Sequence, residues 1–297
     1  MERIHYPVAL LLLLSACGGN GGDGEKSTPG LVIGGDDAGA SPASLYQMPT
    51  PNELFTLVRD LAGEGHKRLL NPVTYADKYV SRKARAINFG IYSTDLIYAS
   101  SFHLNVEVAR YYLTTKKLAE SLGISAAFND ADFVRLEQNI ARGDSLEVIS
   151  NHVYLKAYEK LEQEEMGPVL SLVLAGGWVE SMHLLISQVE AFGRSDAFAD
   201  RIAEQKVTLE HLIEIMKMHE ADADVNEMRQ RLIAIRDIYD SMDLRKLPRP
   251  AEPVKSDRLV IDADTEPLLT DDIYKQLLDS IGALREELTT PEDRPRS

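Results

Sequence analysis

Between residues 51 and 245, apolar side chains recur at intervals of three and four residues. This spacing places them along one face of an α-helix. The first such segment opens at Pro51, and its apolar face consists of Leu54, Leu57, Val58 and Leu61. Segments that alternate with the two-residue period of a half-buried strand are nearly absent. The pattern predicts an all-α fold, an irregular bundle of antiparallel helices over residues 51–245.

Start and stop signals divide this body into separate helices. Asn71-Pro72 is expected to start a second helix that continues to about Ser100, and Gly123 is placed to end a third helix in the left-handed conformation. Ser195 is a suitable N-cap for a later helix. The third helix is expected over residues 105–122 and the helix after Ser195 over 196–216. Further helices are expected over residues 130–141, 145–163, 168–191 and 224–242.

The composition changes beyond the bundle. Residues 246–269 are typical of a stiff Pro-rich linker, with a short extended piece at 258–261. Residues 270–289 are expected to form an extra C-terminal helix with acidic residues in its first turn. The apolar stripe of that helix needs a partner surface, so it either packs on the bundle of its own chain or recognises another protein. Residues 290–297 are expected to be a disordered tail.

The N-terminal region has a different pattern. Arg3 precedes an apolar run from Tyr6 to Leu14, and the run ends in Leu14-Ser15-Ala16-Cys17. A short apolar segment followed by small residues is typical of an export signal that is removed. The last four residues resemble the lipobox of bacterial lipoproteins. The resemblance implies that residues 1–16 are a cleaved signal peptide and that Cys17 carries the lipid, palmitate included.

The residues around this motif fit a lipid anchor. Cys17 is the only cysteine, so no internal disulfide can form. Residues 17–50 are rich in Gly, Ser, Asp and Pro and are expected to form a flexible tether. The apolar runs at 6–14 and 169–179 are both shorter than the about 20 residues that span a bilayer. By the sorting rule of enteric-type lipoproteins, Gly18 in place of Asp favours the outer membrane.

Charge limits the classes of partner. The chain has 32 Lys and Arg against 47 Asp and Glu, a net charge of −15. A surface of this sign repels nucleic acid phosphates and lacks the cations that binding by counterion release needs. We therefore expect no nucleic acid partner, and we expect contact with the membrane only through the lipid on Cys17.

Two apolar helical segments contain a glycine shortly before a carboxylate. In one, Gly90 precedes Asp95, and in the other, Gly176 precedes Glu180; an aromatic residue follows each glycine by two positions. A glycine inside a helix costs about 1 kcal/mol relative to alanine, so it usually has a packing reason. We expect the backbones of these two helices to approach closely at the glycines. An ancestral duplication is compatible with the match, but three shared features do not establish it.

The two carboxylates, Asp95 and Glu180, lie in otherwise apolar turns. A buried carboxylate must find a partner or stay protonated. Lys83 and Arg85 lie about three turns away in the helix of Asp95, so a pairing cation must come from across the bundle. One interpretation is a polar tie between core helices. The other is a ligand-binding pocket, formed by Tyr92, Asp95, Tyr98, Trp178, Glu180 and His183.

Motifs for catalysis and for metal binding are scarce. Glu180 and His183 have the Glu-x-x-His spacing of carboxylate-bridged di-iron proteins, but those sites need a second copy. His103 and Glu107 depart from that spacing. Nucleophile elbows, phosphate-binding glycine loops and dinucleotide fingerprints are missing from the sequence. We therefore assign no catalytic residue, no metal site and no cofactor.

Three runs, Gly90–Ala99, Lys117–Ile124 and Gly176–Glu180, resemble segments of an uncharacterised family of helical lipoproteins from Bacteroidota-type bacteria. The resemblance extends over most of the helical body. It implies a helical fold and an envelope location, and it implies no particular activity.

Together these observations predict an exported, lipid-anchored protein of the cell envelope with a binding or scaffolding role. Its expected partners are an envelope protein or an unidentified small molecule. The alternative is a metal-dependent or carboxylate-based enzyme with a site around Asp95, Glu180 and His183.

Overall fold

The computed structural model describes residues 51–62, 64–125, 131, 134, 135, 138, 139, 146–193, 195–246 and 265–292. In chain order the elements are α1 (Pro51–Ala62), η2 (Lys67–Leu69), η3 (Val73–Lys78), α2 (Arg82–Ser101), α3 (Asn105–Leu122), α5 (Leu146–Gln163), α6 (Gly167–Phe192), α7 (Asp196–Lys217), α8 (Ala223–Asp240), β1 (Asp243–Lys246), β2 (Thr265–Leu268) and α9 (Asp271–Thr289). The predictions for the signal peptide, Cys17, the tether, the extended piece at 258–261 and most of the helix at 130–141 lie outside the described residues.

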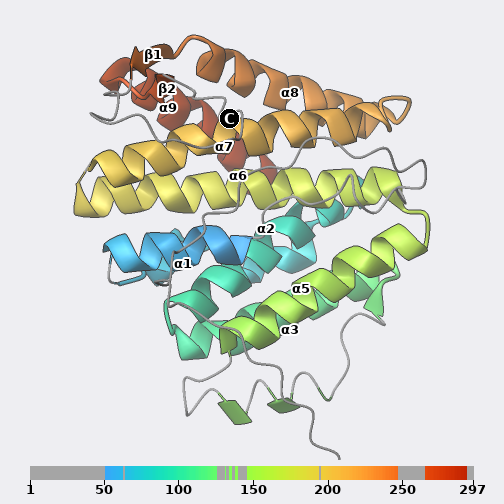
Figure 1. The fold of residues 1–297 in the computed structure, drawn as a ribbon. Helices are drawn as coiled ribbons and strands as arrows, with labels where there is room; N and C mark the ends of the chain where they lie inside the picture. Colours follow the sequence, from blue (N-terminus) through green and yellow to red (C-terminus); the bar gives the residue numbers. More distant parts are fainter. Residues whose placement is uncertain are drawn as a thin grey trace, which may run out of the picture. The chain divides into compact units, whose positions relative to one another are not determined.

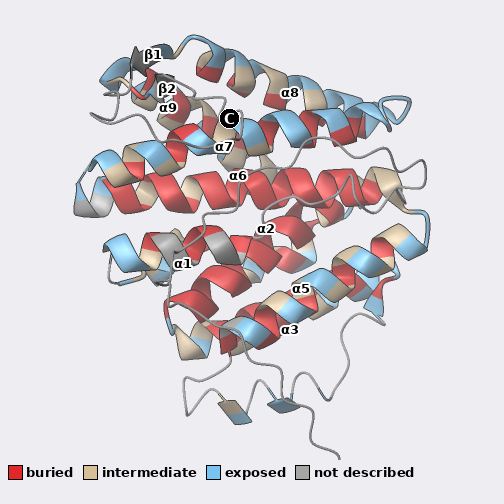
Figure 2. Ribbon diagram, in the orientation of Figure 1, coloured by how far each residue is buried: buried red, intermediate tan, exposed pale blue. Residues whose placement is uncertain are grey.

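The centre of the bundle is the pair α2 and α6. In Figure 1, α6 crosses the middle of the bundle, with α1 and α2 on one side and α7 and α8 on the other. Figure 2 shows that α2 and α6 are buried along nearly their whole length, whereas α7 and α8 each keep an exposed stripe. The amphipathic helices therefore turn their apolar faces toward this central pair, and the predicted all-α bundle is confirmed.

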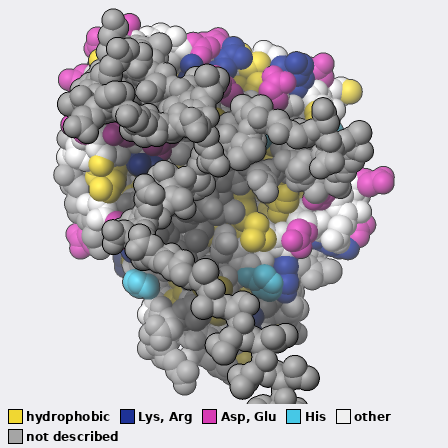
Figure 3. All heavy atoms as spheres, viewed as in Figure 1, with side chains coloured by type: hydrophobic (Ala, Val, Ile, Leu, Met, Phe, Trp, Pro, Cys, Tyr) yellow, Lys and Arg dark blue, Asp and Glu magenta, His cyan; other side chains and the backbone are white. Residues whose placement is uncertain are grey.

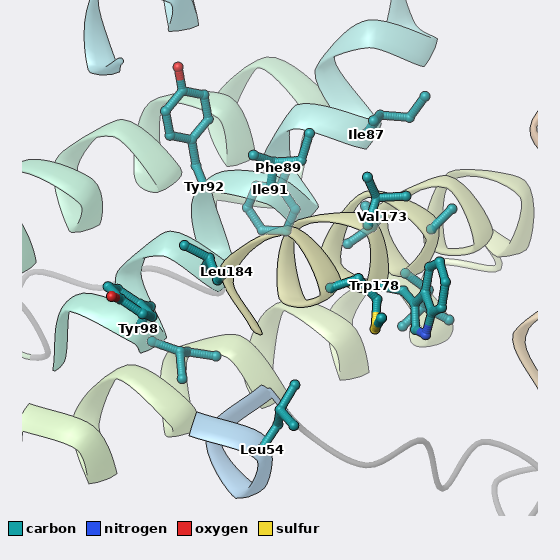
Figure 4. Packing of buried hydrophobic residues seen from close by; sticks show 14 of the residues in the cluster. Leu54, Ile87, Phe89, Ile91, Tyr92, Tyr98, Val173, Trp178 and Leu184 are labelled. Atoms are coloured by element: carbon teal, nitrogen blue, oxygen red, sulfur yellow. The ribbon is translucent and has the colours of Figure 1, made fainter. Parts of the chain in front are cut away.

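One continuous apolar core fills the space between these helices. Figure 4 shows part of it, with side chains such as Leu54 of α1, Phe89 of α2 and Leu184 of α6 packed together. Full burial of a side chain of this size stabilises the fold by about 1.5–3 kcal/mol. The large number of such residues holds the helices together without a disulfide.

The helix α6 is longer and more apolar than the run at 169–179 suggested. Its segment Gly167–Glu190 is long and apolar enough to cross a membrane, so the expectation that this part of the chain is too short was wrong. The most apolar stretch of that segment is, however, 94% buried inside the protein. The apolar surface of α6 is therefore covered by the other helices, as in the core helix of a globular protein.

Three predicted helix ends are confirmed. Gly123 ends α3 in the left-handed conformation with φ 82°, and Ile124, which follows it, is fully buried. The hydroxyl of Ser195 accepts a hydrogen bond from the N–H of Phe198, and that of Thr270 accepts one from Ile273. These side chains satisfy backbone N–H groups that lack partners at the start of a helix.

The predicted start of the second helix at Asn71-Pro72 was wrong. Residues after Pro72 form the short 3-10 helix η3, Tyr79 is extended, and α2 begins only at Arg82 with Ser81 as its N-cap. The reason is tertiary: buried tyrosines of α2 and α3 hold the backbone carbonyls of this segment, as described below. These contacts outweigh the local helical preference of the segment.

The C-terminal region differs from the prediction in its linker and in its last residues, and it decides between the two alternatives for the C-terminal helix. Thr265–Leu268 is not linker but strand β2, which pairs antiparallel with β1 and so brings the start of α9 to the end of α8. The apolar stripe of α9 is buried against α6 and α8, so this helix packs on its own bundle. Beyond α9, the Glu292 carboxylate accepts hydrogen bonds from the N–H groups of Val80 and Ser81. The expected disordered tail therefore begins after this residue at the earliest, because the hydrogen bonds hold it.

Candidate functional site: a buried carboxyl pair

The glycines of α2 and α6 bring the two carboxylates together. A Cβ added at Gly90 would lie 2.0 Å from the carbonyl oxygen of Val173, and one added at Gly176 would lie 2.1 Å from that of Ile87. Only hydrogen fits at these positions, so the two backbones approach closely, as predicted. Asp95 and Glu180, one from each helix, then face each other with no exposed surface.

Glu180 is paired with a cation from α9. Both of its carboxylate oxygens accept hydrogen bonds from Arg285, at 2.7 Å from Nε and 2.8 Å from Nη2. The same Nη2 also donates to the carbonyl oxygen of Leu69 at 3.1 Å. Burial opposes the charge on Arg285, but Glu180 and then Asp95 more than offset this and raise the pKa of the guanidinium. This two-bond geometry is the strongest form of a carboxylate–cation contact.

Asp95 is not paired with a cation in this way. Its Oδ2 accepts a hydrogen bond from the backbone N–H of Asn71 at 3.1 Å, whereas its Oδ1 is buried and has no donor among the described residues. Burial, and next the charge of Glu180, raise the pKa of Asp95 well above its usual range, against the opposing effects of Arg285 and Asn71. The closed structure therefore favours the neutral form of Asp95, and a proton on Oδ1 can be donated toward Glu180.

A ring of tyrosine hydroxyls holds the segment around Asn71. Tyr92 donates to the carbonyl oxygen of Pro72 at 2.7 Å, and Tyr111 donates to that of Asn71 at 2.7 Å. Tyr79 accepts from the side-chain amide of Asn71 and donates to the carbonyl oxygen of Thr289. Burial raises the pKa of Tyr79 to about 12 and raises that of the other two further. These hydroxyls stay neutral and serve as internal hydrogen-bond donors.

The six predicted ligand-binding residues belong to neither of the two hollows found in the described part of the structure. Figure 4 shows Tyr92 and Tyr98 at the left of the view and Trp178 apart from them at the right. The Tyr98 hydroxyl accepts from the N–H of His66 and is bonded to Gln188, and its ring packs edge-on against Phe55. The ligand-binding role of these six residues therefore stays a prediction.

His183 lies one turn beyond Glu180 and is half-buried. Burial lowers its pKa, with Arg285 acting in the same direction and Glu180 and the Leu69 backbone opposing it. Within the part of the chain that the structure describes, three or more side chains of His, Cys, Asp or Glu never come together in a group that could hold a metal ion. Glu180 and His183 thus have no third ligand there, and Arg285 already occupies both oxygens of Glu180.

An open hollow of about 230 Å³ lies elsewhere, between α2, α8 and α9. Its floor includes Ile87, Met228 and Leu284, and two ion pairs, Lys83–Glu227 and Arg231–Glu287, cross its rim. Neither carboxyl of the buried pair belongs to its lining. The lining also contains Glu292, so its charged side chains are two basic and three acidic.

Sequence reasoning missed Arg285 and Asn71, the partners of the two carboxyls. The requirement that a cation come from across the bundle was correct for Glu180. Arg285 was hidden because it lies among the polar positions of α9, next to Leu284 of the apolar stripe. The useful signal is that an arginine beside an apolar stripe can reach a carboxylate on the helix that the stripe covers.

Comparison with known proteins gives no match: no family model fits the sequence, and no curated protein and no solved structure is significantly similar to it. The resemblance to helical lipoproteins therefore stays a prediction.

Proposed function

We propose that this protein is a lipid-anchored protein of the cell envelope whose helical body has a binding or scaffolding role. The observation that carries the proposal is the Leu14-Ser15-Ala16-Cys17 motif, with the only cysteine of the chain at the end of a short apolar run. The expected place of attachment is the outer membrane, with the tether at 17–50 between the lipid and the body.

The body supports a binding role over the enzyme alternative. Asp95 and Glu180 have no exposed surface, and the side chains around them are bonded to internal partners. Catalytic groups must reach a substrate, and in this closed arrangement the carboxyl pair has no exposed surface with which to do so. The acidic and basic side chains are interspersed on the visible upper part of the surface in Figure 3. This mixture favours a protein or small-molecule partner over nucleic acid, which needs a cationic face.

The anchor is tested by labelling cells that express the protein with an alkyne analogue of palmitate, followed by mass spectrometry of the purified chain. We expect label on wild type in the membrane fraction and none on Cys17→Ser. Ser15→Ala keeps a small residue at the same motif and serves as the matched control, with labelling equal to wild type. Equal labelling of Cys17→Ser, or an unlabelled wild type, would refute the anchor.

The binding role is tested against the enzyme alternative by modifying the native protein with a water-soluble carbodiimide and an amine. The peptides that contain Asp95 and Glu180 should stay unmodified, whereas exposed Glu227 should react as the internal control. Modification of either buried carboxyl at the rate of Glu227 would mean that solvent and substrate reach the pair, and it would favour the enzyme.

A further inference from the structure

Two parts of the chain cover the Asp95–Glu180 pair. They are the segment Lys67–Ser81, which contains η2 and η3, and the helix α9; together we call them the lid. Hydrogen bonds join the two parts, from Arg285 to the carbonyl oxygen of Leu69 at 3.1 Å and from Tyr79 to that of Thr289 at 2.9 Å. Opening either part breaks these bonds, so the two parts are mechanically connected.

The lid also supplies the partners of both carboxyls. Asn71 of the first part donates to Asp95, and Arg285 of the second part donates to Glu180. The rest of the pair's surroundings consists of the core between α2 and α6, with the tyrosines described above and His183 at its edge. When the lid opens, both carboxyls therefore lose their hydrogen-bond donors and meet water.

The charges under the closed lid sum to zero when the carboxyl pair binds one proton. Glu180 and Arg285 cancel each other, which leaves Asp95 with a buried Oδ1 and no donor. A second carboxylate in this dry space would be an uncompensated charge, which is costly to bury. With a proton on Oδ1, the site is neutral overall and that oxygen gains a hydrogen to donate.

We propose that the opening of the lid is coupled to the release of this one proton: Asp95 is a neutral acid under the closed lid and a hydrated carboxylate once the lid is open. The direction follows from linkage. The folded pKa of Asp95 is raised, so the stability that its neutral form contributes is complete below the ordinary aspartate pKa and is lost as pH rises toward the folded value. A rise in pH above the ordinary aspartate pKa therefore favours the open lid.

The pKa values of the tyrosines, of His183 and of Arg285 around the pair are all shifted away from neutral pH. Burial raises the pKa of the tyrosine hydroxyls and lowers that of His183, so all of these are neutral, and Arg285 stays charged. Glu107 of α3 forms an ion pair with Arg110. Among the described residues, the titratable groups that interact with the pair are Tyr92 and Tyr98 on α2, Tyr79 after η3, Tyr111 on α3, His183 on α6 and Arg285 on α9; Glu107 lies next to Tyr111.

Hydrogen exchange of backbone amides, measured by mass spectrometry from about pH 4, near the ordinary aspartate pKa, up to about pH 9, tests the coupling. After the intrinsic pH dependence of exchange is divided out, the opening constant of α9 in the wild type should rise with pH, by up to about tenfold per pH unit. Amides of α7, which the lid does not cover, are the internal reference and should show no such rise.

Asp95→Asn places a permanently neutral, similarly shaped group under the lid, so its α9 opening constant should not change with pH. Glu180→Gln is a second variant: it removes the competing charge, lets Asp95 ionise beside Arg285, and should move the rise to lower pH. Glu164→Gln, at an exposed carboxylate that follows α5 and pairs with Lys160, lies away from both the pair and the lid and should behave as wild type. An unchanged slope in Asp95→Asn, or no slope in the wild type, would refute the coupling. Equal loss of protection in α9 and α7 would refute a local lid.

Discussion

At the scale of single residues, the glycines explain why two carboxyls meet in the core. Gly90 and Gly176 allow α2 and α6 to approach until a carbonyl oxygen of each helix fills the space of the missing Cβ on the other. The sequence predicted this approach because glycines in the middle of apolar helices need a packing reason. The proton on Asp95 is then a consequence of how tightly the helices pack.

Alanine at Gly90 should be strongly destabilising. Its Cβ would meet a backbone carbonyl oxygen that cannot move without shifting α6, so we expect a loss of at least about 2 kcal/mol in the free energy of unfolding, measured by urea denaturation. Gly282→Ala in α9 is the matched control, because no atom lies within 4 Å of its added Cβ. That variant should gain about 0.5–1 kcal/mol from helix propensity. Equal effects of the two substitutions would show that packing at Gly90 does not limit the approach.

At the scale of elements, α9 has two functions in the fold. Its apolar stripe covers α6 and α8, and the adjacent Arg285 neutralises Glu180 on α6. The stripe was visible in the sequence, but its binding surface was not. The strand pair β1–β2 helps to explain why α9 packs on its own bundle rather than on another protein. It brings the start of α9 close to the end of α8 and so favours docking within the chain.

Arg285→Ala should cost about 3–5 kcal/mol of unfolding free energy, because it leaves the fully buried Glu180 without its cation. Arg231→Ala removes a cation of similar geometry from the exposed pair with Glu287, and water screens that pair. We expect it to cost at most about 1 kcal/mol. Thermal and urea unfolding of both variants make the comparison. A small effect of Arg285→Ala would mean that Glu180 finds another partner or takes up a proton.

At the scale of the whole molecule, the described core begins with α1. Phe55 of this helix is fully buried and packs edge-on against Tyr98, with ring centroids 5.4 Å apart. Leu54 and Val58 belong to the same core. The apolar side chains of α1 therefore cover the part of the core around Tyr98, and the body that starts at Pro51 includes them.

A chain that starts at residue 51 should keep the helical circular dichroism and the unfolding free energy of the chain that starts at Cys17. A chain that starts at residue 66 lacks α1 and exposes the Tyr98 side of the core, so it should lose several kcal/mol or fail to fold. Urea unfolding of the three chains distinguishes these outcomes. A large loss on removal of residues 17–50 alone would mean that this segment is part of the core.

The sequence by itself determined the class of fold, most helix ends, the close approach at the glycines and the presence of two carboxyls in the core. These features depend on local spacing and on the intrinsic properties of single residues, so they can be read from neighbouring positions. Only the tertiary structure decided that Arg285 pairs with Glu180 across 105 positions, that Asn71 reaches Asp95, and that α2 begins at Arg82. These features depend on how the helices dock, and docking is set by the shape and burial of whole faces rather than by the spacing of residues within one helix.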